Sequence, residues 1–72
     1  MSQYRSHKIR EAASDRVREI LGDDAGGIAV RGVPESENGD GTVNFRVDDC
    51  GMYLRQGDLV RVPKDAIFIS DY

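Results

Sequence analysis

The stretch TVNFRV, residues 42–47, places an apolar side chain at every second position. Val43, Phe45 and Val47 fall on one face of an extended chain, and the polar residues between them fall on the other, because successive side chains of a β-strand point to opposite faces. The alternation predicts a half-buried strand whose inner face contributes to the core.

Other short β patterns surround this strand. GIAVRGVP predicts a strand over residues 28–33 that ends at Pro34, because proline cannot donate a hydrogen bond to a strand ladder. Gln56 and Gly57 predict a tight hairpin turn with glycine supplying a positive φ. Strands are expected on both sides of this turn and near the end of the chain, over MYLR (52–55), DLVRV (58–62) and AIFIS (66–70).

Before Gly26 and Gly27 the apolar period is close to that of a helix. Spacings of three and four residues form one apolar stripe, made by Ile9, Ala12, Ala13, Val17, Ile20 and Leu21. Ser6 or Ser2 is the expected N-cap, and Gly22 is the expected end of the helix.

Together these patterns predict an α+β fold in a single domain over residues 1–72. An N-terminal amphipathic helix over residues 1–22 is expected to precede an antiparallel β meander over residues 27–70. About five short antiparallel strands would then form a small, partly open β-barrel or half-sandwich, with the helix over one side or end.

Composition restricts the functional classes. Cys50 is the only cysteine, so no intrachain disulfide can form, and a reducing compartment is the simplest setting. The N-terminal residues carry charges throughout and lack the apolar run of a signal peptide or membrane span. We therefore expect a soluble cytoplasmic protein, or a virion protein if a phage encodes it.

Charge is unevenly distributed along the chain. The formal net charge is −3, but residues 1–18 carry a net +3 and the rest of the chain carries −6. This polarity favours contact between copies, or docking of the basic segment on an acidic partner.

The acidic loop ESENGDGTV, residues 35–43, does not fit a calcium-binding EF-hand loop. With Gly41 at the sixth position, the first position is Ser36 and the twelfth, which needs a bidentate glutamate, is Val47. We interpret the loop as a solvated turn, with a surface cation site left open as the alternative.

No catalytic constellation is evident. His7, the only histidine, is expected on the polar face at the helix start, where no third group would orient it as a base. Cys50 follows Asp48 and Asp49, which disfavour a reactive thiolate. The sequence therefore predicts no enzyme activity, no cofactor and no metal.

Two classes of binding partner are compatible with the surface residues of this sequence. Arg46, Tyr53, Arg55 and Arg61 resemble the mixed basic and aromatic surface that binds single-stranded nucleic acid, but eleven acids in the same segment and a pI near 4.9 make this the less favoured partner. A protein partner or self-association fits better, because tyrosine combines apolar area with a polar tip. Arg16 lies on the apolar arc of the predicted helix, either snorkelling at its edge or meeting a partner. The candidate interface residues are Tyr4, Arg5, Lys8, Arg16, Tyr53 and Arg55.

The segments IAVRGV, VNFRVDD, YLRQGDLVRVP and AIFI occur in an order that resembles small phage head-tail joining (connector) proteins of the lambdoid type. The resemblance spans residues 28–69, and its most specific element is L-x-x-G-D-x-V-x-V, which includes Gly57 and Asp58. It implies a helix before a compact β-barrel, assembly into a ring, and neither catalysis nor a cofactor, and it transfers no functional residues. This chain is shorter than the typical member.

The first functional hypothesis is therefore a non-catalytic adaptor, a homo-oligomer that works through protein contacts. The alternative is a small regulatory or inhibitory β-barrel that binds a host protein or single-stranded nucleic acid. A calcium-dependent module is the third hypothesis.

Overall fold

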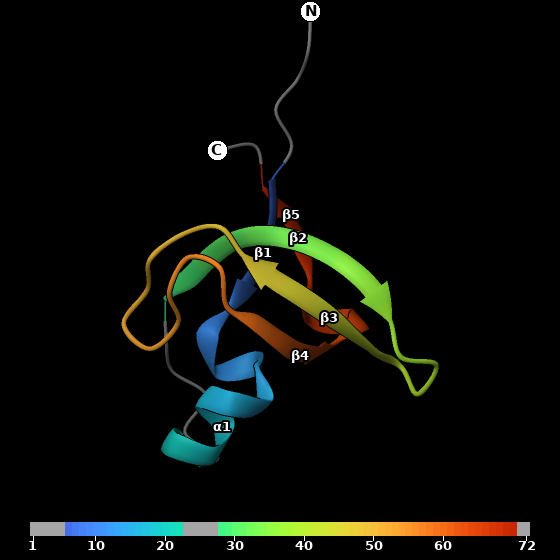
Figure 1. The fold of residues 1–72 in the computed structure, drawn as a ribbon. Coiled ribbons are helices and arrows are strands. Elements are labelled where there is room, and N and C mark those ends of the chain that lie inside the picture. Colours follow the sequence, from blue (N-terminus) through green and yellow to red (C-terminus); the bar gives the residue numbers. More distant parts are fainter. Residues whose placement is uncertain (1–5, 23–27, 71–72) are drawn as a thin grey trace, which may run out of the picture.

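The structure, a computed structural model, describes residues 6–22 and 28–70. Within these ranges it is mostly β, with five antiparallel strands in one sheet and a single short α-helix (Figure 1). The elements in chain order are β1 (Ser6–Arg10), the 3-10 turn η1 (Glu11–Ala13), α1 (Asp15–Leu21), β2 (Ala29–Glu37), β3 (Thr42–Val47), β4 (Leu59–Pro63), the 3-10 turn η2 (Lys64–Ala66) and β5 (Phe68–Ser70).

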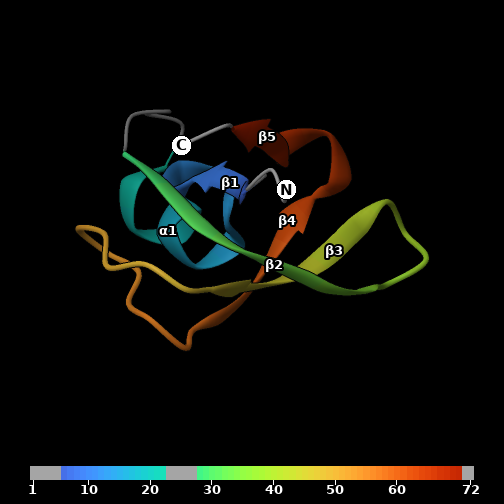
Figure 2. The same cartoon turned by 90° about the horizontal axis from the view of Figure 1, so that it is seen from above.

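The strand order is β4-β3-β2-β1-β5. Strands β2, β3 and β4 form a meander, but β5 leaves it and pairs with β1, so that Ile69 lies opposite His7. The sheet curves strongly, as Figures 1 and 2 show from two directions, yet β4 and β5 remain its two edges. The predicted α+β fold with a barrel or half-sandwich is therefore wrong, and the described residues form an open sheet.

The predicted N-terminal helix is also wrong. Residues 6–10 form strand β1, in which Ile9 pairs with Val30. The helix begins only after Ser14, whose backbone is extended and whose side chain accepts a hydrogen bond from the Val17 N–H at 3.3 Å. Ser14 is thus the N-cap, in place of the predicted Ser6 or Ser2. Gly22 ends the helix as predicted, with a φ of 68°.

The shorter helix changes the environment of Arg16. In α1 the inward side chains are Val17, which is fully buried, and Leu21, which is half-buried one turn later. The Arg16 side chain is 55% exposed. The prediction that Arg16 lies within the apolar arc depended on including Ile9 in the same helix, and that prediction is wrong.

Strand β3 confirms the prediction for TVNFRV, with Val43, Phe45 and Val47 buried. Strand β5 lies within the segment expected for it, and β4 overlaps the expected segment but ends one residue later, at Pro63. The predicted strand over residues 52–55 is wrong, because residues 48–58 form an irregular connection between β3 and β4. The turn at Gln56 and Gly57 is present, with a φ of 96° at Gly57, but it lies inside this connection and does not join two strands.

Strand β2 does not end at Pro34 as predicted. It continues to Glu37, and the register with β3 shifts between Pro34 and Ser36. Within the described residues, the pairing of β1 with β2 ends at Gly32, so Pro34 lies outside this ladder and its missing N–H interrupts no described β1–β2 pairing.

The core lies on the concave side of the sheet, and η1 and α1 close one end of it (Figure 1). It is small and mainly aliphatic, consisting of Ile9, Val17, Val30, Phe45, Val47, Leu54, Val60 and Val62. Gly32 permits the ring of Phe45 to pack closely, because a Cβ at residue 32 would lie 2.3 Å from Phe45 Cε1.

Candidate functional site

The connection of residues 48–58 is held to the N-terminal part of the chain by one buried carboxylate. Glu11, in η1, is fully buried. Its Oε1 accepts a hydrogen bond from the Met52 N–H at 3.1 Å, and its Oε2 accepts from the N–H groups of Tyr53 at 2.8 Å and Leu54 at 2.7 Å. A buried carboxylate is tolerated when several donors satisfy it, so this contact defines the position of residues 52–54.

Two features determine how closely the 48–58 connection packs against Glu11 and where Glu11 lies. At Gly51 an added Cβ would lie 2.3 Å from Glu11 Oε2 and 2.9 Å from Val30 Cγ1, so only glycine fits between them. The Glu11 N–H donates to the Ile28 carbonyl at 3.0 Å, and this bond fixes the backbone position from which the Glu11 side chain extends. The connection is therefore packed against η1 and is not a loosely attached loop.

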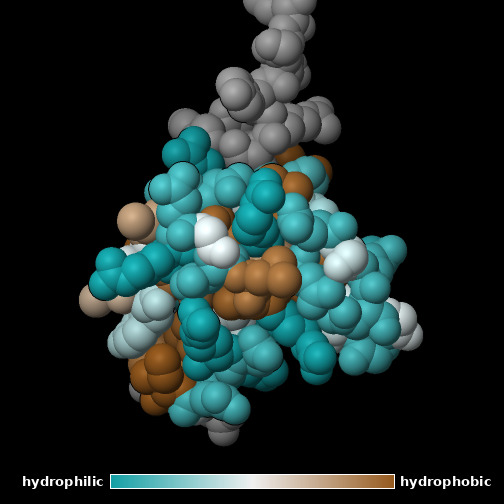
Figure 3. Space-filling view, viewed as in Figure 1, coloured by the Kyte–Doolittle hydropathy of each residue, from teal (hydrophilic) through white to brown (hydrophobic). Residues whose placement is uncertain are grey.

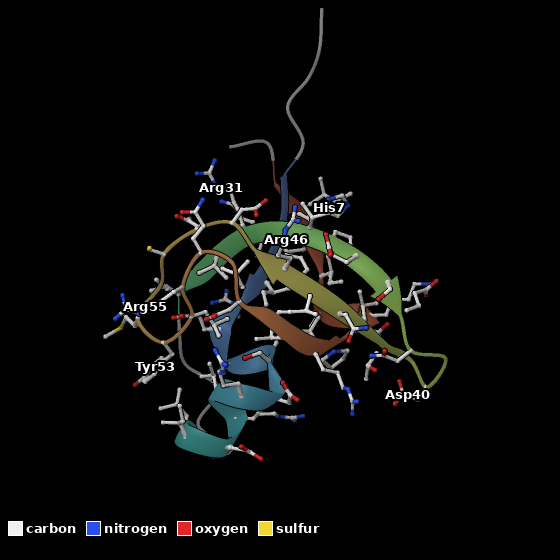
Figure 4. The ribbon with its side chains drawn as sticks, in the orientation of Figure 1. His7, Arg31, Asp40, Arg46, Tyr53 and Arg55 are labelled. Carbon is white, nitrogen blue, oxygen red and sulfur yellow. The ribbon has the colours of Figure 1, made fainter. Side chains whose placement is uncertain are left out.

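Most side chains of this anchored segment point outward. Leu54 is fully buried, whereas Met52 is 74% exposed and Tyr53 is 37% exposed. Arg55 is exposed as well. Figure 4 shows Tyr53 and Arg55 extending from the same end of the molecule, away from the sheet. We call Met52, Tyr53 and Arg55 the 52–55 surface.

Arg16 is joined to this region through Asp58. Its Nη1 lies 3.0 Å from Asp58 Oδ2, and the same oxygen accepts a hydrogen bond from the Arg55 N–H at 2.9 Å. The structure thus brings together Arg16, Tyr53 and Arg55, three of the predicted interface residues.

Of the other predicted interface residues, Lys8 does not join this cluster. Lys8 lies in β1, opposite Arg31 of β2 and Phe68 of β5. Tyr4 and Arg5 lie outside the described residues.

Arg46, one of the arginines predicted to bind nucleic acid, does not present an unpaired charge. Arg46 is paired with two carboxylates, Glu35 at 3.1 Å and Asp48 at 3.6 Å. Figure 4 places Arg46 over the sheet and Tyr53 at the opposite side of the 48–58 connection. The predicted group is therefore divided, with Arg46 over the sheet and Tyr53 together with Arg55 on the 52–55 surface.

The acidic turn after β2 uses its polar groups internally. The Asp40 carboxylate accepts hydrogen bonds from the Thr42 hydroxyl and from the Thr42 N–H, and these bonds, with the more distant charge of Arg61, lower the pKa of Asp40. Asn44 donates to Ser36 and to Asn38, each at 2.9 Å. Within residues 6–22 and 28–70, no three His, Cys, Asp or Glu side chains are grouped as metal ligands would be.

A groove of about 510 Å³ lies beside β5. Its apolar lining comes from Pro34, Val43, Ile67 and Ile69, and Glu37 and Lys64, which form an ion pair at 3.0 Å, lie at its polar side. His7 also lines it, as a half-buried residue of β1. The expected position of His7 on the polar face of a helix is therefore wrong. Sequence reasoning missed this groove because its lining comes from three parts of the chain that are distant in the sequence: residue 7, residues 34–43 and residues 64–69.

The face of the molecule drawn in Figure 3 is mainly hydrophilic. Figure 3 shows one face of the molecule with isolated apolar areas, including one over the α1 end, where Ile20 is 61% exposed. Within the described residues, no helix is long and apolar enough to cross a membrane.

No protein-family model, curated protein or solved structure matches this chain.

Proposed function

We propose that this chain is a non-catalytic adaptor that binds a protein partner through the 52–55 surface. One observation carries the proposal: the Glu11 carboxylate is buried to hold the backbone of residues 52–54, while Met52, Tyr53 and Arg55 remain exposed. A surface that is ordered before binding loses less conformational entropy when a partner docks.

The composition of this surface supports a protein partner. Tyrosine, methionine and arginine are enriched at protein interfaces, and tyrosine and arginine dominate binding hot spots. Arg16 lies next to them through Asp58 and adds a second guanidinium at the margin. Charge pairs at such a margin affect the association rate and specificity more than affinity.

Ring assembly, as in the phage head-tail joining proteins, is one specific form of this proposal. It stays a prediction that rests on the resemblance of residues 28–69. Nucleic-acid binding is not favoured by the geometry, because the carboxylates of Glu35 and Asp48 neutralise Arg46.

The test is comparative affinity capture from the source cells with quantitative mass spectrometry. The double variant Met52→Ala/Tyr53→Ala removes most of the 52–55 surface. The matched control, Leu59→Ala/Val33→Ala, truncates apolar side chains that are 59% and 38% exposed on the sheet. Circular dichroism would establish that both variants are folded.

We expect a partner that the wild type and the control variant capture in equal yield. The Met52→Ala/Tyr53→Ala variant should capture at least about tenfold less of it, as the truncation of hot-spot residues predicts. If this variant retains the same proteins at the same yield, the 52–55 surface is not the binding site and the proposal fails.

A further inference from the structure

The two edges of the sheet differ in how they are protected. At the β4 edge, the Arg61 N–H donates to Asp15 Oδ1 at 3.3 Å, so the start of α1 satisfies a backbone donor there. Pro63 lies at the end of the same strand and has no N–H. Charged side chains, prolines and covering elements are the usual means by which edge strands avoid pairing with other chains.

Strand β5, at the other edge, is only three residues long, and its composition offers less protection. Its segment, Phe68–Ser70, contains no charged residue and no proline. Phe68 is 41% exposed and Ile69 is 55% exposed. Strand β5 pairs with β1 on one side, and no described strand pairs on the other.

The groove lies on the face of the sheet to which Ile69 contributes. Ile67 and Ile69 line the groove from β5 and the residue before it, and we call these two side chains the apolar wall. A strand added beside β5 would direct alternate side chains toward this apolar wall, which is the arrangement that proteins use when a strand is added to an exposed edge.

We propose that the β5 edge binds the β5 edge of a second copy of this chain, in an antiparallel pair centred on Ile69. A two-fold axis at this residue places Ile69 opposite Ile69 of the second copy and Phe68 opposite Ser70. Like charges are absent from the paired segment, and directly opposite β-branched side chains stabilise antiparallel pairs.

This arrangement also covers apolar surface that the monomer exposes. Directly opposite residues of two antiparallel strands lie on the same face of the sheet, so both Ile69 side chains would lie on the groove face. The two apolar walls then become continuous, and the sheet extends through both copies. The 52–55 surface lies in the connection to β4, at the other end of the strand order, and stays exposed in each copy.

The first test is sedimentation velocity over a dilution series. We expect a concentration-dependent dimer for the wild type and at least tenfold weaker association for Ile69→Lys, which places two ammonium groups at the axis. Leu59→Lys is the matched control, because Leu59 is an exposed apolar residue of the other edge strand and should associate like the wild type. A wild type that stays monomeric to about 1 mM overturns the proposal, and so does a dimer that Ile69→Lys leaves intact.

Cross-linking tests the register and remains informative if Ile69→Lys fails to fold. In a Cys50→Ser background, which removes the exposed native thiol, Ile69→Cys should form a disulfide-linked dimer under mild oxidation. The distance between directly opposite Cα atoms, about 4.5–5.5 Å, lies within the range of disulfides. Leu59→Cys in the same background should stay monomeric. Equal cross-linking of the two variants, or none at residue 69, contradicts the pairing.

Discussion

The Leu54 N–H donates to Glu11 Oε2 at 2.7 Å, and both residues are completely buried although they lie 43 positions apart in the chain. Leu54 contributes its side chain to the core, and its backbone joins η1 to the 48–58 connection. The same carboxylate accepts two further N–H groups, from Met52 and Tyr53. The core at this end of the sheet and the exposed 52–55 surface therefore depend on one side chain.

Replacing Glu11 should destabilise the fold strongly. Glu11→Ala leaves three N–H groups without their acceptor and creates a cavity, and we expect a loss of about 3–5 kcal/mol. Glu11→Gln keeps the shape but turns an NH₂ group toward backbone donors, with an expected loss of about 1–3 kcal/mol. Urea unfolding followed by circular dichroism measures both values.

The control for this prediction is Glu19→Gln, which removes a carboxylate at an exposed position of α1. It should change the free energy of unfolding by less than about 0.5 kcal/mol. Equal effects of Glu11→Gln and Glu19→Gln would show that the three hydrogen bonds contribute nothing to stability.

The alternating pattern of β3 was readable from the sequence because one of its faces is buried and the other is solvated. The N-terminal segment was misread because Ile9 fits two periods: it lies four residues before Ala13 and eight before Val17, but also two residues after His7 in a strand. The expected position of Arg16 on the apolar arc, where a charged group is unfavourable, was the physical sign that the predicted helix was too long. Ser14 was the overlooked signal, since serine before an acidic first turn is a typical N-cap.

The anchor of the candidate site could not be predicted in the same way. Glu11 is satisfied by backbone N–H groups, which every residue except proline carries, so no side-chain pattern over residues 52–54 identifies its partners. Tyr53 and Arg55 were selected by residue type alone. Arg16 lies near them because it forms an ion pair with Asp58, the residue just before β4. The hydrophobic periodicity of the sequence gives no information about this contact.

Gly32 should be among the positions most sensitive to a single added methyl group. A Cβ there would lie 2.2 Å from the Arg46 carbonyl oxygen and 2.3 Å from the Phe45 ring. Neither group can move away without disturbing β3 or the core, so Gly32→Ala is expected to cost about 2–4 kcal/mol. Thermal and urea unfolding provide the measurement.

The comparison variant is Gly57→Ala, in which the added Cβ meets no atom within 4 Å but the backbone has a φ of 96°. Only conformational strain opposes it, and about 1 kcal/mol is expected. A Gly32→Ala loss no larger than that of Gly57→Ala would mean that the β2–β3 packing is looser than the distances indicate.

Calcium should leave the melting temperature unchanged. The carboxylates near the β2–β3 turn are already engaged, Glu35 with Arg46, Glu37 with Lys64 and Asp40 with Thr42. A site with a Kd of about 1 mM would stabilise the fold by about 1.4 kcal/mol at about 10 mM calcium, enough to raise Tm by several degrees. Thermal unfolding with calcium chloride, compared with sodium chloride of equal ionic strength, decides between these outcomes, and a calcium-specific rise would restore the calcium hypothesis.

Asp40 should make stability depend on pH at the acidic end of the range. The Thr42 hydroxyl and N–H donate to its ionised form and lower its pKa in the folded protein. A carboxyl group with a lowered pKa stabilises the fold above its unfolded-state pKa, and this contribution is lost as pH falls through the lowered value. In Thr42→Val the hydroxyl donor is absent, so an NMR titration of the Asp40 carboxyl should give a higher midpoint than in the wild type, whereas Asp40→Asn should remove this part of the pH dependence. An unchanged midpoint in Thr42→Val would show that the hydroxyl hydrogen bond does not stabilise the carboxylate in solution.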